Sequence, residues 1–255
     1  MPNRLTLSVL DGIPLVQPGD DLAAQILSAL ETSGERLQDG DILVVAQKIV
    51  SKSENRIVAL SQFEPSDRAR ELADLVEKDA RVVEAILRES RAVIRAKPGV
   101  LIVENNLGLI MANAGIDHSN VESARPDETL LLLPIDPDAS AAALREELGE
   151  RTGADIAVIV NDSVGRAWRI GTVGLAIGVA GLPAVVDLRG EKDLFGRELR
   201  VSEEAVADEL AAAASLLQGQ GAEGKPVVLI RGFETDAPVQ PATAALRPTE
   251  QDMFR

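Results

Sequence analysis

The stretch GDILVVAQKIVSK, residues 40–52, joins an apolar run to a group of polar side chains. A Gly-Asp turn followed by the β-branched run at residues 42–46 predicts a buried strand. The polar residues Gln47, Lys48, Ser51 and Lys52 follow this run, and we expect them to form a loop where the strand ends.

Helical patterns flank this strand in the sequence. Apolar residues recur at helical spacing from Leu22 to Leu30, with Asp20 or Asp21 as the N-cap, and Gly34 ends the pattern. Pro65 suits a first helical turn. Ser202 begins the last pattern as a variant of the capping box. The other predicted helices span residues 65–78, 79–89, 138–151 and 202–217.

Short apolar runs predict further strands between these helices. We expect them at residues 100–103, 109–112, 130–133, 156–160, 184–187 and 227–230. Mixed strands and helices throughout indicate an α/β or α+β fold. Residues 1–233 are predicted to form one domain, either a single core or two intimately joined subdomains. Residues 234–255 contain three prolines and are predicted to run extended as part of the same domain.

Charge and composition exclude several classes of protein. The net charge of −15 repels phosphate backbones, so nucleic acid is not an expected partner. The absence of cysteine excludes disulfide scaffolds, thiolate zinc sites and cysteine nucleophiles. No apolar run is long enough for a signal peptide or a membrane span. We therefore expect a cytoplasmic protein that does not associate with a membrane.

Two aspartates stand in the same local setting, each just after an apolar stretch. Asp117 follows LIMANAGI, and Asp162 follows IAVIVN. One interpretation is that both are ordinary turn or cap residues. The other is that they bind a hard divalent cation at the rim of the sheet, with Ser119, Asn120 and Ser163 as neighbouring neutral oxygen ligands. The residues alone leave both open.

His118 is the only histidine, so it cannot build a multi-histidine zinc site, and we expect a polar loop residue. The segment DSVGRAWRIG places Arg166 and Arg169 around the only tryptophan. The two guanidiniums would suit carboxylate or phosphate oxygens. An ordinary surface loop with Trp168 docked in the core is the alternative.

The segment GQGAEG, residues 219–224, has the spacing G-x-G-x-x-G. A dinucleotide fingerprint must follow a strand and open a helix, whereas here a helix precedes and a strand follows. The segment is therefore not a Rossmann loop, and no Walker A sequence occurs in the chain. Its glycines would still let backbone N–H groups approach a phosphate.

Taken together, eight motifs resemble the GTP-dependent F420-0 gamma-glutamyl ligase family. The resemblance runs from Gly12 to Arg255, essentially the whole chain, and several long motifs in the same order are more specific than any one of them. The motifs are GIPLVQPGDD, AQKIVSK, NAGIDHSNV, LLLPIDPDAS, NDSVGRAWRIG, LRGEKDLFGREL, VADELAAAASLLQGQG and RPTEQDMFR.

The resemblance implies an α+β fold with mainly antiparallel sheets, two joined subdomains and a homodimer. It implies that Asp117 and Asp162 bind one divalent ion, Mg²⁺ or Mn²⁺, with Ser163 and Gln220 on a second, and K⁺ as a further cofactor. It also implies a set of residues that surround GTP: Ile13, Pro14, Leu15, Val16, Gln47, Lys48, Lys52, Asn120, Gln218, Gly219, Gln220, Gly221, Ala222, Glu223, Gly224 and Lys225.

The implied reaction is amide formation between coenzyme F420-0 and L-glutamate. GTP would activate the terminal carboxylate of F420-0 as an acyl phosphate, and glutamate would then displace phosphate. Asp117, Asp162, Lys52, Arg166 and Arg169 are the expected catalytic residues. A ligase of the same mechanism on another acid, such as a pterin cofactor, and a non-catalytic nucleotide-binding dimer are the alternatives.

Overall fold

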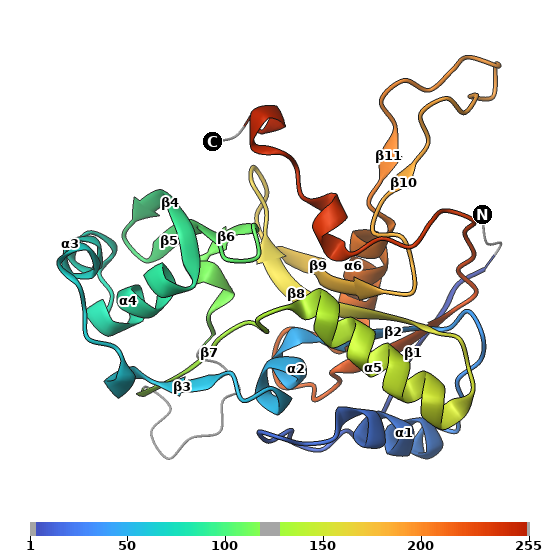
Figure 1. The fold of residues 1–255 in the computed structure, drawn as a ribbon, viewed down its shortest axis with the longest axis horizontal. Helices are drawn as coiled ribbons and strands as arrows, with labels where there is room; N and C mark the ends of the chain where they lie inside the picture. Colours follow the sequence, from blue (N-terminus) through green and yellow to red (C-terminus); the bar gives the residue numbers. More distant parts are fainter. Residues whose placement is uncertain (1–3, 118–127, 254–255) are drawn as a thin grey trace.

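A computed structural model describes residues 4–117 and 128–253 (Figure 1). Its centre is a five-stranded sheet in the order β1-β12-β2-β8-β9. The pair β2–β8 is parallel, and the other neighbours are antiparallel. The strands are β1 (Thr6–Val9), β2 (Ile42–Ala46), β8 (Ala157–Gly165), β9 (Thr172–Ala180) and β12 (Val227–Arg231).

Helices cover both faces of this sheet, which explains why its central strands are continuous apolar runs. In β2, Leu43 and Val45 pack against one layer of helices, while Ile42 and Val44 pack against the opposite helix. The first layer consists of α1 (Leu22–Thr32), α2 (Gln47–Ser53) and α5 (Pro137–Thr152), and α6 (Val206–Gln218) covers the other face.

A second core lies beside the first, on the left in Figure 1. It packs α3 (Asp67–Val76) and α4 (Ala80–Arg88) against a three-stranded antiparallel sheet of β4 (Ser90–Lys97), β5 (Val100–Asn105) and β6 (Ile110–Ala112). The two-stranded ribbon of β3 (Ile57–Ala59) and β7 (Thr129–Leu131) connects the two parts of the chain. The expected α+β class with two joined subdomains is confirmed.

The short strands β10 (Val186–Asp187) and β11 (Glu203–Glu204) form the base of an arm that projects from the body of the protein (Figure 1). In residues 234–253, the described part of the final segment, the regular elements are the 3-10 helices Ala242–Ala245 and Thr249–Gln251. None of the helices in the described ranges is long and apolar enough to cross a membrane.

Local capping explains several helix starts. Asp21 caps α1 by accepting a hydrogen bond from the N–H of Ala24 at 2.8 Å, and Asp136 caps α5 through Ala139 at 3.0 Å. Ser66 caps α3, so Pro65 precedes the helix instead of lying in its first turn.

The predicted start of the last helix is wrong. Glu203 and Glu204 pair with Val186 and Asp187 as strands, so α6 begins only at Val206. This long-range pairing overrides the local capping pattern at Ser202. The predicted strand at residues 184–187 is correspondingly shorter, because only Val186–Asp187 has strand geometry.

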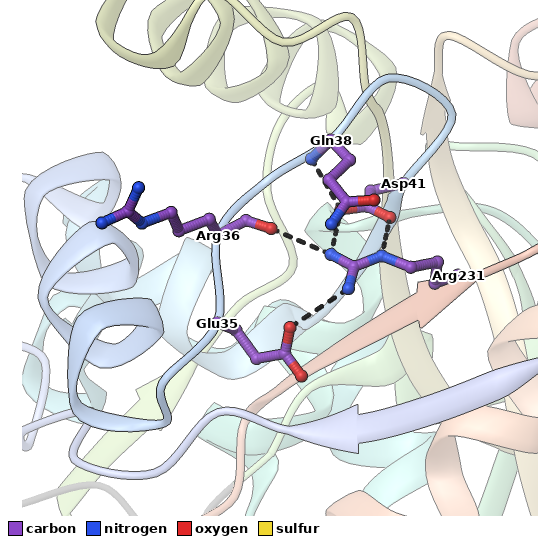
Figure 2. A network of polar contacts seen from close by, with 5 residues as sticks. All are labelled: Glu35, Arg36, Gln38, Asp41 and Arg231. Carbon is purple, nitrogen blue, oxygen red and sulfur yellow. Dashed lines mark hydrogen bonds and ion pairs between the residues drawn. The ribbon is translucent and has the colours of Figure 1, made fainter.

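A buried ion pair ties the end of β12 to the connection between α1 and β2 (Figure 2). Both carboxylate oxygens of Asp41, which is 1% exposed, accept hydrogen bonds from Arg231 at 2.8 Å. Arg231 also donates to the carbonyl of Arg36 and pairs with Glu35 at 3.2 Å. The pair lies at the end of the sheet away from the cavity described next, because Pro226 lines that cavity at the start of β12.

Candidate ligand-binding site

A cavity of about 870 Å³ opens beside the end of β2, the middle of β8 and the residue before β12. Because β2 and β8 are parallel neighbours and Ala46 at the end of β2 pairs with Asn161, the residues that follow β2 come close to Asp162 and Ser163 in β8. The wall also takes residues from the segment before α1 and from the loop after α6. The lining residues are Ile13, Pro14, Leu15, Val16, Ala46, Gln47, Lys48, Ile49, Lys52, Asp117, Asn161, Asp162, Ser163, Thr172, Gln218, Gly219, Gln220, Gly221, Ala222, Gly224, Lys225 and Pro226.

The segment after β2 is a helix, α2, and not the predicted polar loop. Its sequence gives no capping signal, because the N-cap residue is Ala46 and makes no side-chain hydrogen bond. Gln47 is 3% exposed and accepts a hydrogen bond from the fully buried Ser51 hydroxyl at 2.8 Å. These paired polar groups make the helix compatible with burial.

Asp117 and Asp162 both line the cavity, although 45 positions separate them in the sequence. Asp117 is held by a two-way backbone bridge to Leu131, at 3.0 and 2.9 Å. Asp162 lies within β8, which continues to Gly165, so it does not follow the strand as the sequence suggested. The structure thus brings two carboxyl groups from distant parts of the sequence to one surface.

The electrostatics of Asp162 reflect this convergence. Burial raises the pKa of the Asp162 carboxyl to about 6, and the charge of Asp117 also raises it. The N–H of Ser163, the charge of Lys48 and a hydrogen bond with Gln47 oppose the rise. The raised pKa means that Asp162 holds its proton more tightly than an exposed aspartate does. A site with two carboxylates and adjacent neutral oxygens suits a hard divalent cation.

The loop after α6 is anchored to the sheet by two amide side chains. Gln218 donates to the carbonyls of Val44 and Pro226 at 3.2 and 3.1 Å. Its own amide oxygen accepts a hydrogen bond from Asn161 at 2.7 Å. Gly219 has φ +74, a left-handed backbone conformation that residues with a Cβ rarely adopt. This position therefore requires glycine.

Some predicted site residues do not line the cavity. Arg166 and Arg169 lie on the connection between β8 and β9, outside the cavity lining. Trp168 in the same connection is 87% exposed, so the alternative prediction that it docks in the core is wrong. Glu223 instead accepts a hydrogen bond from the N–H of Gly221 at 2.8 Å within the loop. The predictions for His118, Ser119 and Asn120 lie outside the described residues.

Sequence reasoning missed five lining residues: Ala46, Ile49, Asn161, Thr172 and Pro226. Asn161 and Thr172 carry polar side chains into the site region, and the hydroxyl of Thr172 donates to the amide oxygen of Gln220 at 3.4 Å. Thr172 could have been placed near the site from strand pairing, because it pairs with Gly165 across the hairpin of β8 and β9. That register is visible only once β9 is recognised as a strand.

The fold and the cavity define a class of mixed α/β protein with a large, partly polar cavity at the edge of a mixed sheet. Within the described ranges, no group of three or more His, Cys, Asp or Glu side chains is arranged to hold a metal. A metal bound here would therefore need neutral oxygen ligands beside the two aspartates.

Comparison with known proteins gives the family. Residues 12–232 match the family described as F420-0:gamma-glutamyl ligase. A coenzyme F420:L-glutamate ligase of Methanothermobacter thermautotrophicus is 48% identical, over 98% of this chain and 99% of its own. The ligase of the same name from Archaeoglobus fulgidus is 46% identical, over 90% and 88%. The chain belongs to the F420-0:gamma-glutamyl ligase family and is an enzyme of the ligase class.

Proposed function

We propose that this enzyme uses GTP to join L-glutamate to the terminal carboxylate of coenzyme F420-0 through an amide bond. Products are the glutamylated coenzyme, GDP and phosphate, and the same chemistry would add further gamma-linked glutamates. The single observation that carries the proposal is the joint lining of one large cavity by Asp117, Asp162 and Lys52 together with the glycine-rich loop. The names of the relatives supply the substrates.

The chemistry requires activation because a carboxylate is a poor acyl donor. In the proposed reaction a carboxylate oxygen of F420-0 attacks the γ-phosphorus of GTP, and GDP leaves with the electrons of the broken bond. The amine of glutamate then attacks the acyl phosphate, the C–O bond breaks, and phosphate leaves. The displaced amine proton passes to solvent or phosphate. No enzyme nucleophile takes part.

The residues of the cavity fit these requirements. Asp117 and Asp162 would hold one divalent ion, Mg²⁺ or Mn²⁺, and Ser163 with Gln220 would contact a second. Such ions neutralise charge on a transferring phosphoryl group. Lys52, which is 8% exposed, offers a compact positive charge to a phosphate oxygen. Backbone N–H groups of the loop at residues 218–225 would surround the remaining phosphates.

Arg166 and Arg169 do not line the cavity, so the cavity does not carry their proposed catalytic role. We retain for them a role toward the carboxylates of F420-0 or glutamate, as their guanidinium groups suit such oxygens. A potassium ion as a further cofactor belongs to the same proposal. These roles would be tested by activity with and without K⁺ and by substitution of each arginine.

We also propose a homodimer. Large apolar side chains are exposed on two projecting segments: Trp168 and Ile170 between β8 and β9, and Leu194 and Phe195 on the arm above β10 and β11. Exposed apolar groups of this size favour contact with another protein surface. Light scattering after size-exclusion chromatography tests this, and a monomer at micromolar concentration would contradict it.

One incubation distinguishes the proposed ligase from its rivals. The protein is mixed with GTP, Mg²⁺ or Mn²⁺, L-glutamate and F420-0, and the products are weighed by mass spectrometry. We expect a glutamate-sized mass increment on F420-0 that depends on GTP. GTP hydrolysis with an increment on a pterin acid instead would favour a ligase of another substrate. Nucleotide binding without turnover would favour a non-catalytic dimer.

A further inference from the structure

Lys48 and Asp117 form an ion pair inside the cavity, at the proposed metal site. The Lys48 ammonium lies 2.5 Å from a carboxylate oxygen of Asp117, and both side chains are only 30% exposed. Lys48 extends from the beginning of α2 in one subdomain, whereas Asp117 is fixed by its bridge to β7. The pair therefore joins the two sides of the cavity.

The same ammonium acts on the second carboxylate. The charge of Lys48 favours the ionised form of Asp162, while the charge of Asp117 disfavours it. One cation thus compensates two carboxylates that repel each other. A divalent ion between Asp117 and Asp162 would have the same electrostatic role with twice the charge.

The Lys48 side chain can move away from Asp117. A lysine ammonium is a point charge on a flexible four-carbon stem, and it is not committed to one bidentate geometry as arginine is. Asp117 has less freedom, because its backbone is hydrogen-bonded in both directions to Leu131. Displacement of the pair would therefore move the lysine and leave the carboxylate in place.

We infer that Lys48 is a built-in counter-ion for Asp117 and Asp162, which a divalent cation displaces and which then becomes available to a nucleotide phosphate. This inference rests on the proposed function, because it assumes a divalent ion at the two aspartates. In the metal-free protein the Lys48 ammonium compensates the charges of the two carboxylates. When a metal ion is added, it has to compete with Lys48 for them. A nucleotide offers the displaced ammonium a new partner.

Two consequences follow from this exchange. Mn²⁺ alone binds more weakly than the two carboxylates would otherwise allow, because it must displace an ion pair. Mn²⁺ and GDP bind with positive coupling, because GDP phosphate stabilises the arrangement in which Lys48 has left Asp117. A lysine that only contacts nucleotide would not weaken the binding of Mn²⁺ alone.

The test measures Mn²⁺ binding by isothermal titration calorimetry without nucleotide, and again with GDP. For Lys48→Met we expect Mn²⁺ affinity without nucleotide to rise about tenfold, as loss of a partly screened cation near the site allows. Lys48→Arg keeps the charge and should not increase the affinity. Lys225→Met is the matched control, since Lys225 lines the same cavity from the glycine-rich loop. In the titration without nucleotide, this variant should change Mn²⁺ affinity by no more than about twofold.

The sign of the change decides the outcome. Unchanged or weaker Mn²⁺ binding in folded Lys48→Met overturns the inference, as does an equal increase in Lys225→Met. Lys48→Gln provides a second neutral variant if the methionine variant does not fold. Absence of Mn²⁺ binding to the unaltered protein would overturn the metal site and the inference together. If Asp162→Asn removes Mn²⁺ binding but Lys48→Met does not tighten it, the metal site stands and only the inference about Lys48 is overturned.

Discussion

The side-chain amide of Asn161 donates a hydrogen bond of 2.7 Å to the amide oxygen of Gln218. Asn161 belongs to β8 beside Asp162, and Gln218 is the last residue of α6 before the glycine-rich loop. Gln218 in turn holds the carbonyls of Val44 and Pro226. This chain of amides connects β8, β2 and the residue before β12 to the loop that we propose surrounds GTP.

Replacement of Gln218 by alanine should weaken nucleotide binding about tenfold, because the loop loses its anchor. It should also lower the free energy of unfolding by about 1 to 3 kcal/mol, because the hydrogen-bond partners of Gln218 are left unsatisfied. Titration of GDP and urea unfolding measure the two effects. Leu216→Ala is the control on the same helix, since Leu216 is 85% exposed. Equal behaviour of the two variants would contradict the anchoring role.

Asp117→Asn and Asp162→Asn should each lower the rate of ligation at least about a hundredfold, equivalent to roughly 2.7 kcal/mol in the activation barrier. Each change removes the negative charge of a proposed metal ligand on the cavity wall and no apolar volume from the core. Initial rates at several Mn²⁺ concentrations and thermal unfolding curves are the measurements. Activity that survives both substitutions at low Mn²⁺, in a folded protein, would exclude the proposed metal role.

The sequence predicted those parts of the fold that carry local signals. α1 and α5 have apolar spacing and aspartate caps, and both were located within a few residues. β9 was missed because its glycines disfavour a strand by propensity. The structure requires them: a Cβ at Gly174 would lie 2.4 Å from the carbonyl oxygen of Ala211 in α6. A requirement set by a distant helix cannot be recognised in the strand itself.

The candidate site was predictable to the same extent. The segment before α1 and the glycine-rich loop were expected from family resemblance, and both line the cavity. The meeting of Asp117 with Asp162 depends on the bridge between Asp117 and Leu131 and on the parallel pairing of β2 with β8. Both are long-range contacts, so local patterns left the turn and metal interpretations equally open.

Replacement of Arg231 by methionine should lower the free energy of unfolding by roughly 3 kcal/mol, since it leaves Asp41 buried without its bidentate partner (Figure 2). Urea unfolding measures the loss. The control is Arg189→Met, which breaks an exposed pair with Asp187 and should cost much less than Arg231→Met, because exposed ion pairs contribute little. Nucleotide affinity should be retained in both variants. A loss at Arg231 no larger than at Arg189 would contradict the structural role of the buried pair.

Glu84 should make the second subdomain sensitive to acid. Its carboxylate accepts hydrogen bonds from the N–H and the hydroxyl of Ser66, at 3.0 and 2.7 Å, and from Arg88 at 3.0 Å. The Ser66 N–H, followed by its hydroxyl and by Arg88, lowers the pKa of Glu84 below its ordinary value of 4.5. A lowered folded-state pKa stabilises the protein above pH 4.5, and this contribution disappears as the pH falls through the folded-state pKa.

Glu84→Gln should therefore lower the free energy of unfolding by about 1 to 2 kcal/mol at pH 7, because hydrogen bonds to a charged acceptor become neutral ones. The difference from the unaltered protein should shrink as the pH falls below about 4.5, where the unfolded glutamate becomes protonated. Urea unfolding between pH 7 and pH 3 measures this convergence. Glu71→Gln is the control, because Glu71 pairs with Arg68 on the exposed side of α3. A destabilisation by Glu84→Gln that stays constant across this range would show that shape, and not charge, determines the contribution of Glu84.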